Sequence, residues 1–140
     1  MSGRIQKEII DNETYFIIEI DYNSTFDLKL EITDENGAAK DVSDLTKVHF
    51  TAKSSLNDTD AAALININSS ANSSQFNISS ASSGVIISSL TAANNIWLPI
   101  APQKGVFCVR LERTVDSVAK SDIIGKGKIF AERVANLNTS

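Results

Sequence analysis

Apolar and polar residues alternate strictly in two stretches of the first half of the chain. In residues 25–33 the even positions are apolar and the odd positions polar, and residues 47–53 repeat this pattern. Because successive side chains of a β-strand point to opposite faces, each stretch predicts a strand with one buried face. The residues predicted to face the core are Phe26, Leu28, Leu30, Ile32, Val48, Phe50 and Ala52.

Six further segments carry strand signals. Residues 13–20 place Phe16, Ile18 and Ile20 on one apolar face. The others are 62–68, 75–78, 84–88, 105–115 and 122–134. Residues 116–121 join the last two strands and predict a hairpin loop. Gly125 and Gly127 lie inside the last strand, where glycine predicts a bulge or a close approach of two backbones.

Turn and loop signals separate these strands. Asn36-Gly37 predicts a tight turn, because both residue types tolerate a positive φ. Residues 91–98 form the best helical segment, which Pro99 closes. Ser, Thr and Asn dominate residues 66–95, so we expect a mobile loop around one or two short strands there, with the Ser/Asn-rich part at 66–83.

These elements predict an all-β protein, an antiparallel Ig-like β-sandwich with one short helical segment near 91–98. No Cys…Trp…Cys pattern is present, so a true immunoglobulin domain is excluded while an Ig-like topology stays open. We expect an N-terminal arm at 1–12, a sandwich domain at 13–134 and a C-terminal tail at 135–140.

Composition narrows the class of protein further. The chain has 140 residues, which suffice for one domain, and its net charge of -4 gives no electrostatic case for binding nucleic acid. No apolar run approaches a membrane span and the N-terminus lacks a signal-peptide core, so we expect no membrane partner and synthesis in the cytoplasm. The single cysteine excludes an internal disulfide and a cysteine-clustered metal site.

The residues that could carry catalysis have simpler explanations. His49 is the only histidine, and alternation places it on the outward face of its strand with no neighbouring partner or pocket. Cys108, between Phe107 and Val109, is predicted to be a small buried hydrophobe. Ser117 and Lys120 match the S-x-x-K acylation motif, but in a hairpin loop the lysine would be solvated.

Three acidic groups, at 34–36, 41–44 and 57–60, favour turn hydrogen bonds over calcium binding, since none supplies a complete loop of oxygen ligands. We therefore expect no enzyme activity, no cofactor and no metal.

One apolar cluster leaves two interpretations open. Trp97 lies among Ile96, Leu98 and Ile100. It either closes one end of the sandwich as a core residue or serves as an aromatic anchor for a partner subunit, since tryptophan is favoured at interface centres. These four residues are the candidate partner interface.

Three stretches resemble one family of phage proteins. The first, residues 21–53, contains a strand, an acidic Asn-Gly turn, the connector D-V-S-D-L-T and a second strand ending in lysine. The second is the Asp-rich loop at 54–62. The third comprises residues 83–94, which contain G-V-I-I-S-S-L-T-A-A, and the strand at 104–110. Together they resemble the Ig-like β-sandwich of phage baseplate upper proteins and related tail or fibre-attachment proteins.

The resemblance implies a structural virion protein of a tailed phage, located in the tail, the baseplate or a fibre-attachment position. It implies assembly with other virion proteins and with copies of itself. A head decoration or connector protein is an alternative. A carbohydrate-binding or adhesin module is another, for which Tyr15, Tyr22 and Trp97 are the available aromatic residues.

Overall fold

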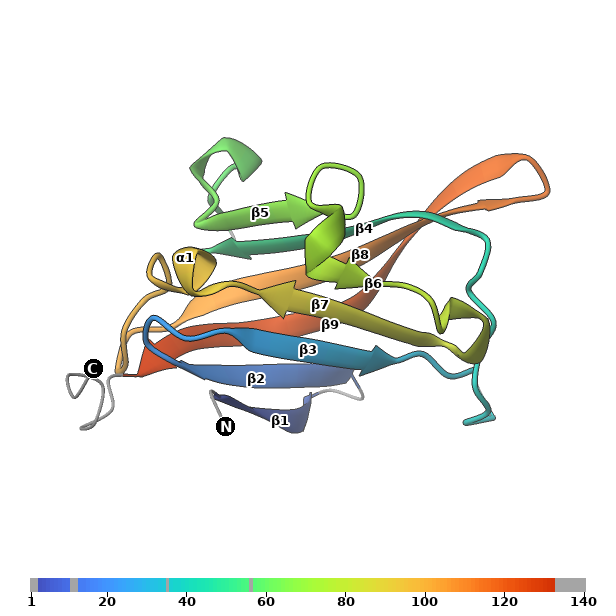
Figure 1. Cartoon of the computed structure of the whole chain (residues 1–140). Helices are drawn as coiled ribbons and strands as arrows, with labels where there is room; N and C mark the ends of the chain where they lie inside the picture. Colours follow the sequence, from blue (N-terminus) through green and yellow to red (C-terminus); the bar gives the residue numbers. More distant parts are fainter. Residues whose placement is uncertain (1–2, 11–12, 35, 56, 133–140) are drawn as a thin grey trace.

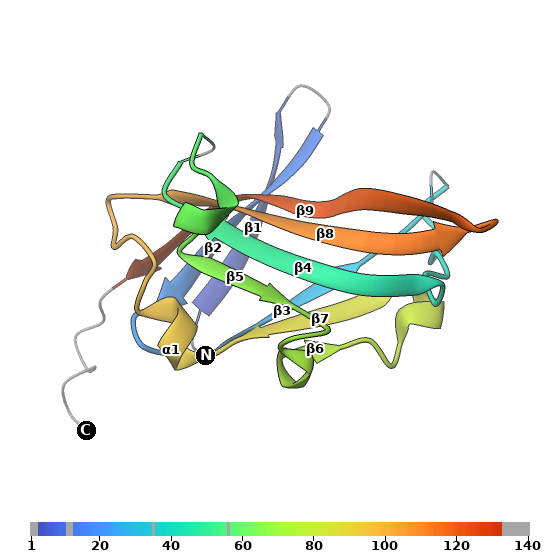
Figure 2. The same ribbon diagram turned by 90° about the horizontal axis from the view of Figure 1, so that it is seen from above.

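Two β-sheets face each other in the structure. The computed structural model describes residues 3–10, 13–34, 36–55 and 57–132 (Figure 1). The larger sheet has the strand order β1-β2-β9-β8-β4-β5 and the smaller one has the order β3-β7-β6. The strands are β1 (Gly3–Ile10), β2 (Glu13–Asp21), β3 (Phe26–Glu31), β4 (Leu45–Lys53), β5 (Ile65–Asn68), β6 (Phe76–Asn77), β7 (Val85–Leu90), β8 (Gly105–Val115) and β9 (Val118–Glu132). Seen from above, β3, β7 and β6 form a separate layer beside the larger sheet (Figure 2).

The core lies between the two sheets and follows the alternation of the sequence. Phe50 and Phe107 stack across β4 and β8 with ring centroids 5.8 Å apart. Burying such side chains removes apolar surface from water and contributes about 1.5–3 kcal/mol each. The buried cluster includes Ile18, Ile20, Leu28, Leu30, Val48, Phe50, Ala52, Ile86, Leu90, Phe107, Val109, Leu111 and Ile129, with Phe16, Phe26 and Ile32 packed against it. The inward faces predicted for β2, β3 and β4 are therefore confirmed.

The prediction of a wholly antiparallel sandwich is wrong at one pair of strands. β2 pairs with β9 in the parallel direction, from Phe16 beside Gly127 to Asp21 beside Glu132. The other strand pairs are antiparallel. The structure thus has two open sheets in a sandwich-like arrangement with one short helix.

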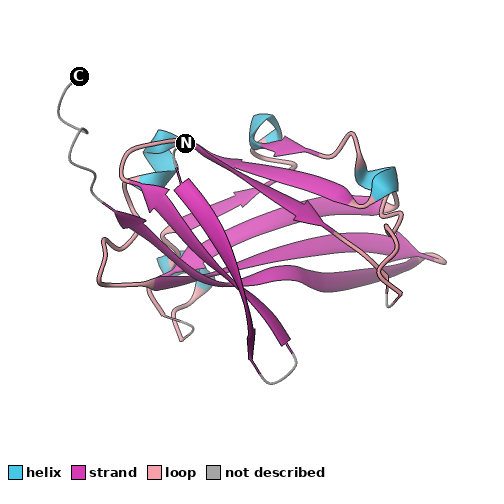
Figure 3. Cartoon of the chain, turned by 90° about the horizontal axis from the view of Figure 1, so that it is seen from below, coloured by secondary structure: helices cyan, strands magenta, loops and turns pink. Residues whose placement is uncertain are grey.

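Residues 3–10, which we expected to be part of an arm, form the edge strand β1. This strand pairs antiparallel with β2 along its whole length, from Gly3 beside Ile20 to Ile10 beside Glu13. Figure 3 shows the β1–β2 pair extending beyond the body of the two sheets. The expected tail at 135–140 lies outside the described residues.

The β8–β9 connection is tighter than predicted. Asp116 and Ser117 have positive φ values of 52° and 64° and make a two-residue turn, and β9 begins at Val118. Two-residue hairpin turns use left-handed conformations because these match the twist of the paired strands. The six-residue loop expected at 116–121 is therefore wrong.

Both glycine predictions for the last strand are confirmed. Val109 of β8 pairs with Gly125 of β9, but the next residue, Arg110, pairs with Ile123. The extra residue between positions 123 and 125 of β9 marks a bulge. Gly127 has a φ of 152°, and a Cβ at this position would lie 1.8 Å from the carbonyl oxygen of Phe16. A side chain would therefore prevent β2 from approaching β9.

The Ser/Asn-rich segment 66–83 contains more regular structure than a mobile loop. It holds most of β5, all of β6 and the 3₁₀ turns η2 (Ser73–Gln75) and η3 (Ala81–Ser83). The Asn68 Oδ1 atom accepts hydrogen bonds from the backbone N–H groups of Ser70 and Ala71, at 3.0 and 2.8 Å. Such short polar side chains hold turns by bonding nearby backbone groups.

Among the described residues, the helices are too short and too polar to cross a bilayer.

Candidate functional site

The best candidate site is a cavity of about 420 Å³ on the outer face of the larger sheet. Except for the core residue Phe107, the lining residues of β4 and β8 are those that alternate with the core positions and point away from the smaller sheet. Residues of β5 complete the lining. Its lining comprises His49, Thr51, Lys53, Asn66, Asn68, Val106, Phe107, Cys108 and Arg110. We call this feature the outer-face cavity.

Strand register places the lining side chains in rows. His49 lies between Asn68 of β5 and Arg110 of β8. Thr51 lies in the next row between Asn66 and Cys108. Residues directly opposite each other on one face of a sheet have Cβ atoms about 4.5–5.5 Å apart, so each row forms one continuous polar surface. Outward from β8, Lys126 of β9 is paired with Cys108.

His49 has the partner and the cavity that the sequence did not reveal. Its Nε2 atom lies 2.5 Å from Oε2 of Glu112. The hydrogen bond to His49 is the largest cause of a lowered pKa for the Glu112 carboxyl. The expectation of a histidine without a partner or pocket is therefore wrong, because Glu112 reaches it from β8, 63 residues away in the chain.

Cys108 lines the cavity on the outer face and is half buried, whereas we expected it in the core. Burial raises the pKa of its thiol, and the nearby cations Arg110, Lys126 and Lys53 oppose this effect only in part. The thiol is the weakly nucleophilic form of cysteine. Among the described residues, Cys108 has no hydrogen bond to His49, so the two do not form the nucleophile and base pair that covalent catalysis requires.

The cavity is rich in hydrogen-bond donors. Arg110 and Asn66 are exposed, and neither has a hydrogen bond or ion pair with the residues that the structure describes. The Asn68 carbonyl oxygen is used within its turn, which leaves the amide NH₂ group of that side chain. Lys53 also lines the cavity, and its Nζ donates to the Asp58 carbonyl oxygen at 3.1 Å, an acceptor that lies outside the lining. This arrangement suits the binding of an acceptor-rich ligand.

The structure exposes two of the four residues of the candidate partner interface, Ile96 and Trp97, and packs the other two, Leu98 and Ile100, in or against the core. Thr91 caps the single α-helical turn α1 (Ala92–Asn95) through a reciprocal pair of hydrogen bonds with Asn94, so the predicted helical segment is confirmed in part of its range. Leu98 is 3 % exposed and Ile100 packs against the core. Ile96 and Trp97 are 41 % and 64 % exposed, so the interpretation of Trp97 as a buried core residue is wrong.

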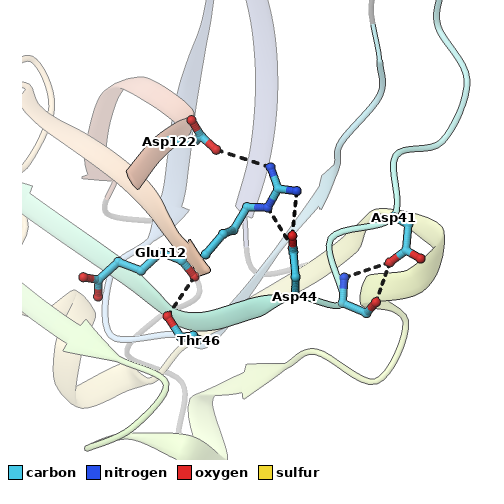
Figure 4. Close-up of polar contacts among 7 residues, drawn as sticks. Asp41, Asp44, Thr46, Glu112 and Asp122 are labelled. Atoms are coloured by element: carbon cyan, nitrogen blue, oxygen red, sulfur yellow. Dashed lines mark hydrogen bonds and ion pairs between the residues drawn. The ribbon is translucent and has the colours of Figure 1, made fainter. Parts of the chain in front are cut away.

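A separate polar cluster at the far end of β8 has a structural role. The Arg113 guanidinium lies between Asp44 and Asp122, the two carboxylates labelled in Figure 4. It donates to both carboxylate oxygens of Asp44 at 2.8 and 2.9 Å and lies 3.6 Å from Asp122. The hydrogen bonds to Arg113 are the main reason that the pKa of Asp44 is lowered. This bidentate pair holds the residue preceding β4 against β8.

The remaining sequence motifs resolve as turn chemistry. Asp34 accepts hydrogen bonds from the backbone of Asn36 and Ala38, and Asp41 accepts from Ser43. Asp58 accepts from the backbone N–H of Ser55, which confirms the turn interpretation for all three acidic groups. Ser117 lies in the β8–β9 turn and Lys120 is exposed in β9, so the S-x-x-K residues do not meet in a buried site.

Comparison of the chain with protein-family models, with curated proteins and with solved structures gives no match.

Proposed function

We propose that this chain is a non-enzymatic structural protein of a tailed phage particle, located in the tail, the baseplate or a fibre-attachment position. It would be made in the host cytoplasm and act by assembling with other virion proteins and with copies of itself. The resemblance of residues 21–62, 84–93 and the strand from Gly105 supports this proposal. The observation that carries it is the exposed pair Ile96 and Trp97.

These two side chains form a prearranged contact surface. Leu98, one residue further, is buried and fixes the segment to the core, while the capped turn α1 fixes it from the other side. A tryptophan held in this way loses little conformational freedom when a partner covers it. Tryptophan also contributes more than most residues at interface centres, which makes position 97 the expected anchor.

The outer edge of β1 supports assembly through the backbone. β1 is the first strand in the order of its sheet, and among the strands that the structure describes it pairs only with β2. The hydrogen-bonding groups on the other edge are those to which a strand from another chain can add. A second copy of this chain or a neighbouring virion protein would therefore extend the larger sheet.

Photo-crosslinking inside assembled particles tests the proposal. A benzoylphenylalanine residue at position 97 should capture another virion protein in purified particles, and mass spectrometry should detect this chain in the same fraction. Position 118 is the matched control, because Val118 is 56 % exposed but lies in the β8–β9 hairpin. Absence of the chain from purified particles would refute the proposal, and equal capture from both positions would refute the assignment of Trp97 as the anchor.

The location of the captured partner separates this proposal from its closest alternative. A major head protein captured from position 97 would indicate a decoration or connector role, whereas a tail or baseplate protein would support the proposal. The aromatic residues do not favour the adhesin alternative, because Trp97 is well exposed whereas Tyr15 and Tyr22 are partly buried and Tyr22 packs against the core.

A further inference from the structure

A concentration of positive charge surrounds the outer-face cavity, although the chain as a whole carries a net charge of -4. Lys53 and Arg110 line it, and Lys126, whose ammonium lies 5.0 Å from the centroid of the Tyr15 ring, pairs with the lining residue Cys108. The positive charge of all three lowers the pKa of the Cys108 thiol against the effect of its burial. On the same face, the Glu112 carboxylate is hydrogen-bonded to His49. A cavity with this balance of charge attracts an anion.

The neutral lining groups favour a ligand that carries neutral polar atoms as well as an anionic group. The amides of Asn66 and Asn68 and the hydroxyl of Thr51 lie in two adjacent rows beside the cations. Such groups hydrogen-bond to neutral polar atoms such as sugar hydroxyls. A ligand that carries both an oxyanion and several hydroxyl groups would satisfy the charged and the neutral parts of the surface together.

We propose that the outer-face cavity binds an anionic saccharide, a sugar unit bearing a phosphate or carboxylate group. Arg110 binds its oxyanion, and Asn66, Asn68 and Thr51 bind its hydroxyl groups. This site is distinct from the Ile96–Trp97 surface and does not depend on the proposed structural role.

An acidic peptide fits the same charge less well. A peptide that binds by strand addition needs an unpaired strand edge, and both edges of β4 are already paired, with β5 and β8. The cavity lies on the face of these strands, where a peptide has no backbone ladder to join. Its volume of about 420 Å³ suits a compact ligand.

Cys108 provides a direct reporter, because it is the only cysteine of the chain and lines the cavity. The rate of its alkylation by N-ethylmaleimide at pH 8 can be measured with glucose 1-phosphate, glucuronate, glucose, inorganic phosphate or a hexaglutamate peptide present. We expect glucose 1-phosphate or glucuronate to slow alkylation at concentrations at which glucose and inorganic phosphate do not. If glucose 1-phosphate protects Cys108 better than glucuronate, phosphate is the preferred anion, and the reverse result identifies carboxylate.

Two variants locate the binding groups. Arg110→Gln should weaken protection by at least about tenfold, the range expected for loss of a hydrogen bond to a charged group. Asn66→Ala should weaken saccharide binding by less than Arg110→Gln. Lys29→Gln is the matched control, since it removes one exposed charge from β3 of the other sheet and should leave binding unchanged. Urea unfolding curves verify that each variant folds.

Several results would overturn the proposal. Protection by hexaglutamate but by neither saccharide would assign the cavity to an acidic peptide. Equal protection by inorganic phosphate and glucose 1-phosphate would show that the neutral groups do not contribute. Equal weakening by Lys29→Gln and Arg110→Gln, or no protection by any of these compounds, would show that the cavity is not a saccharide site.

Discussion

Replacing Gly127 with alanine should disrupt the contact between β2 and β9. A Cβ atom on residue 127 would lie 1.8 Å from the Phe16 carbonyl oxygen and 2.7 Å from the Phe16 nitrogen. Both are backbone atoms, so no side-chain rotation relieves the overlap. The two strands must move apart at the first pair of their parallel ladder.

Two effects set the size of the loss. The φ of 152° at Gly127 is unfavourable for a residue with a Cβ and costs about 1–3 kcal/mol. Overpacking against a fixed neighbour costs about another 1–3 kcal/mol. The free energy of unfolding should therefore fall by about 2–6 kcal/mol, a large fraction of the 5–15 kcal/mol that is typical of a folded domain.

Urea unfolding followed by far-UV circular dichroism measures this loss, and two other glycines separate its causes. Gly125→Ala adds a methyl group in the same strand, where the nearest atom is a movable Leu30 methyl at 3.4 Å, and should cost less than about 1 kcal/mol. Gly37→Ala tests the conformational effect alone, because its φ is +83° but nothing lies within 4 Å, and should cost about 1–2 kcal/mol.

Hydrogen exchange adds a local measurement. The β1–β2 pair joins the rest of the larger sheet through β9, so amides of residues 16–21 should exchange faster in Gly127→Ala than in Gly125→Ala. If Gly127→Ala were as stable as Gly125→Ala, the close approach of β2 to β9 would be refuted.

Three further substitutions or conditions probe other parts of the structure. Ser117→Gly should raise the free energy of unfolding by about 1 kcal/mol in urea, because glycine relieves the φ of 64° in the β8–β9 turn, and a loss of stability would contradict this turn. Asn95→Ala should lower the free energy of unfolding by about 1–3 kcal/mol, because the fully buried Asn95 donates to the Ser24 carbonyl oxygen at 2.6 Å. An unchanged urea midpoint would argue against that bond. The pKa values of Asp41, Asp44 and Glu112 are lowered by their hydrogen bonds, so the unfolded chain binds more protons and stability should fall as the pH drops below about 4. Asp44→Asn should make this fall shallower in urea midpoints measured from pH 5 to pH 2, and an unchanged slope would contradict it.

The sequence predicts faces of strands better than it predicts their partners. Alternation identified the buried positions of β3 and β4, since side-chain direction depends only on neighbouring residues. The parallel pairing of β2 with β9 joins residues more than a hundred positions apart, and nothing local specifies it. The β8–β9 turn was missed for a different reason, because Asp116-Ser117 lacks the glycine that usually marks a two-residue hairpin.

The same distinction explains why the outer-face cavity was not predicted. The polar lining residues occupy positions whose outward direction the alternation already gives, as for His49 and Thr51. Their grouping depends on register, because a shift of one residue between β4 and β8 would move Arg110 and Cys108 to the core face. The buried positions Val48, Phe50, Val109 and Leu111 fix that register by packing into a common core. Core packing therefore determines which polar side chains meet outside, and the site becomes visible only once the strand pairing is known.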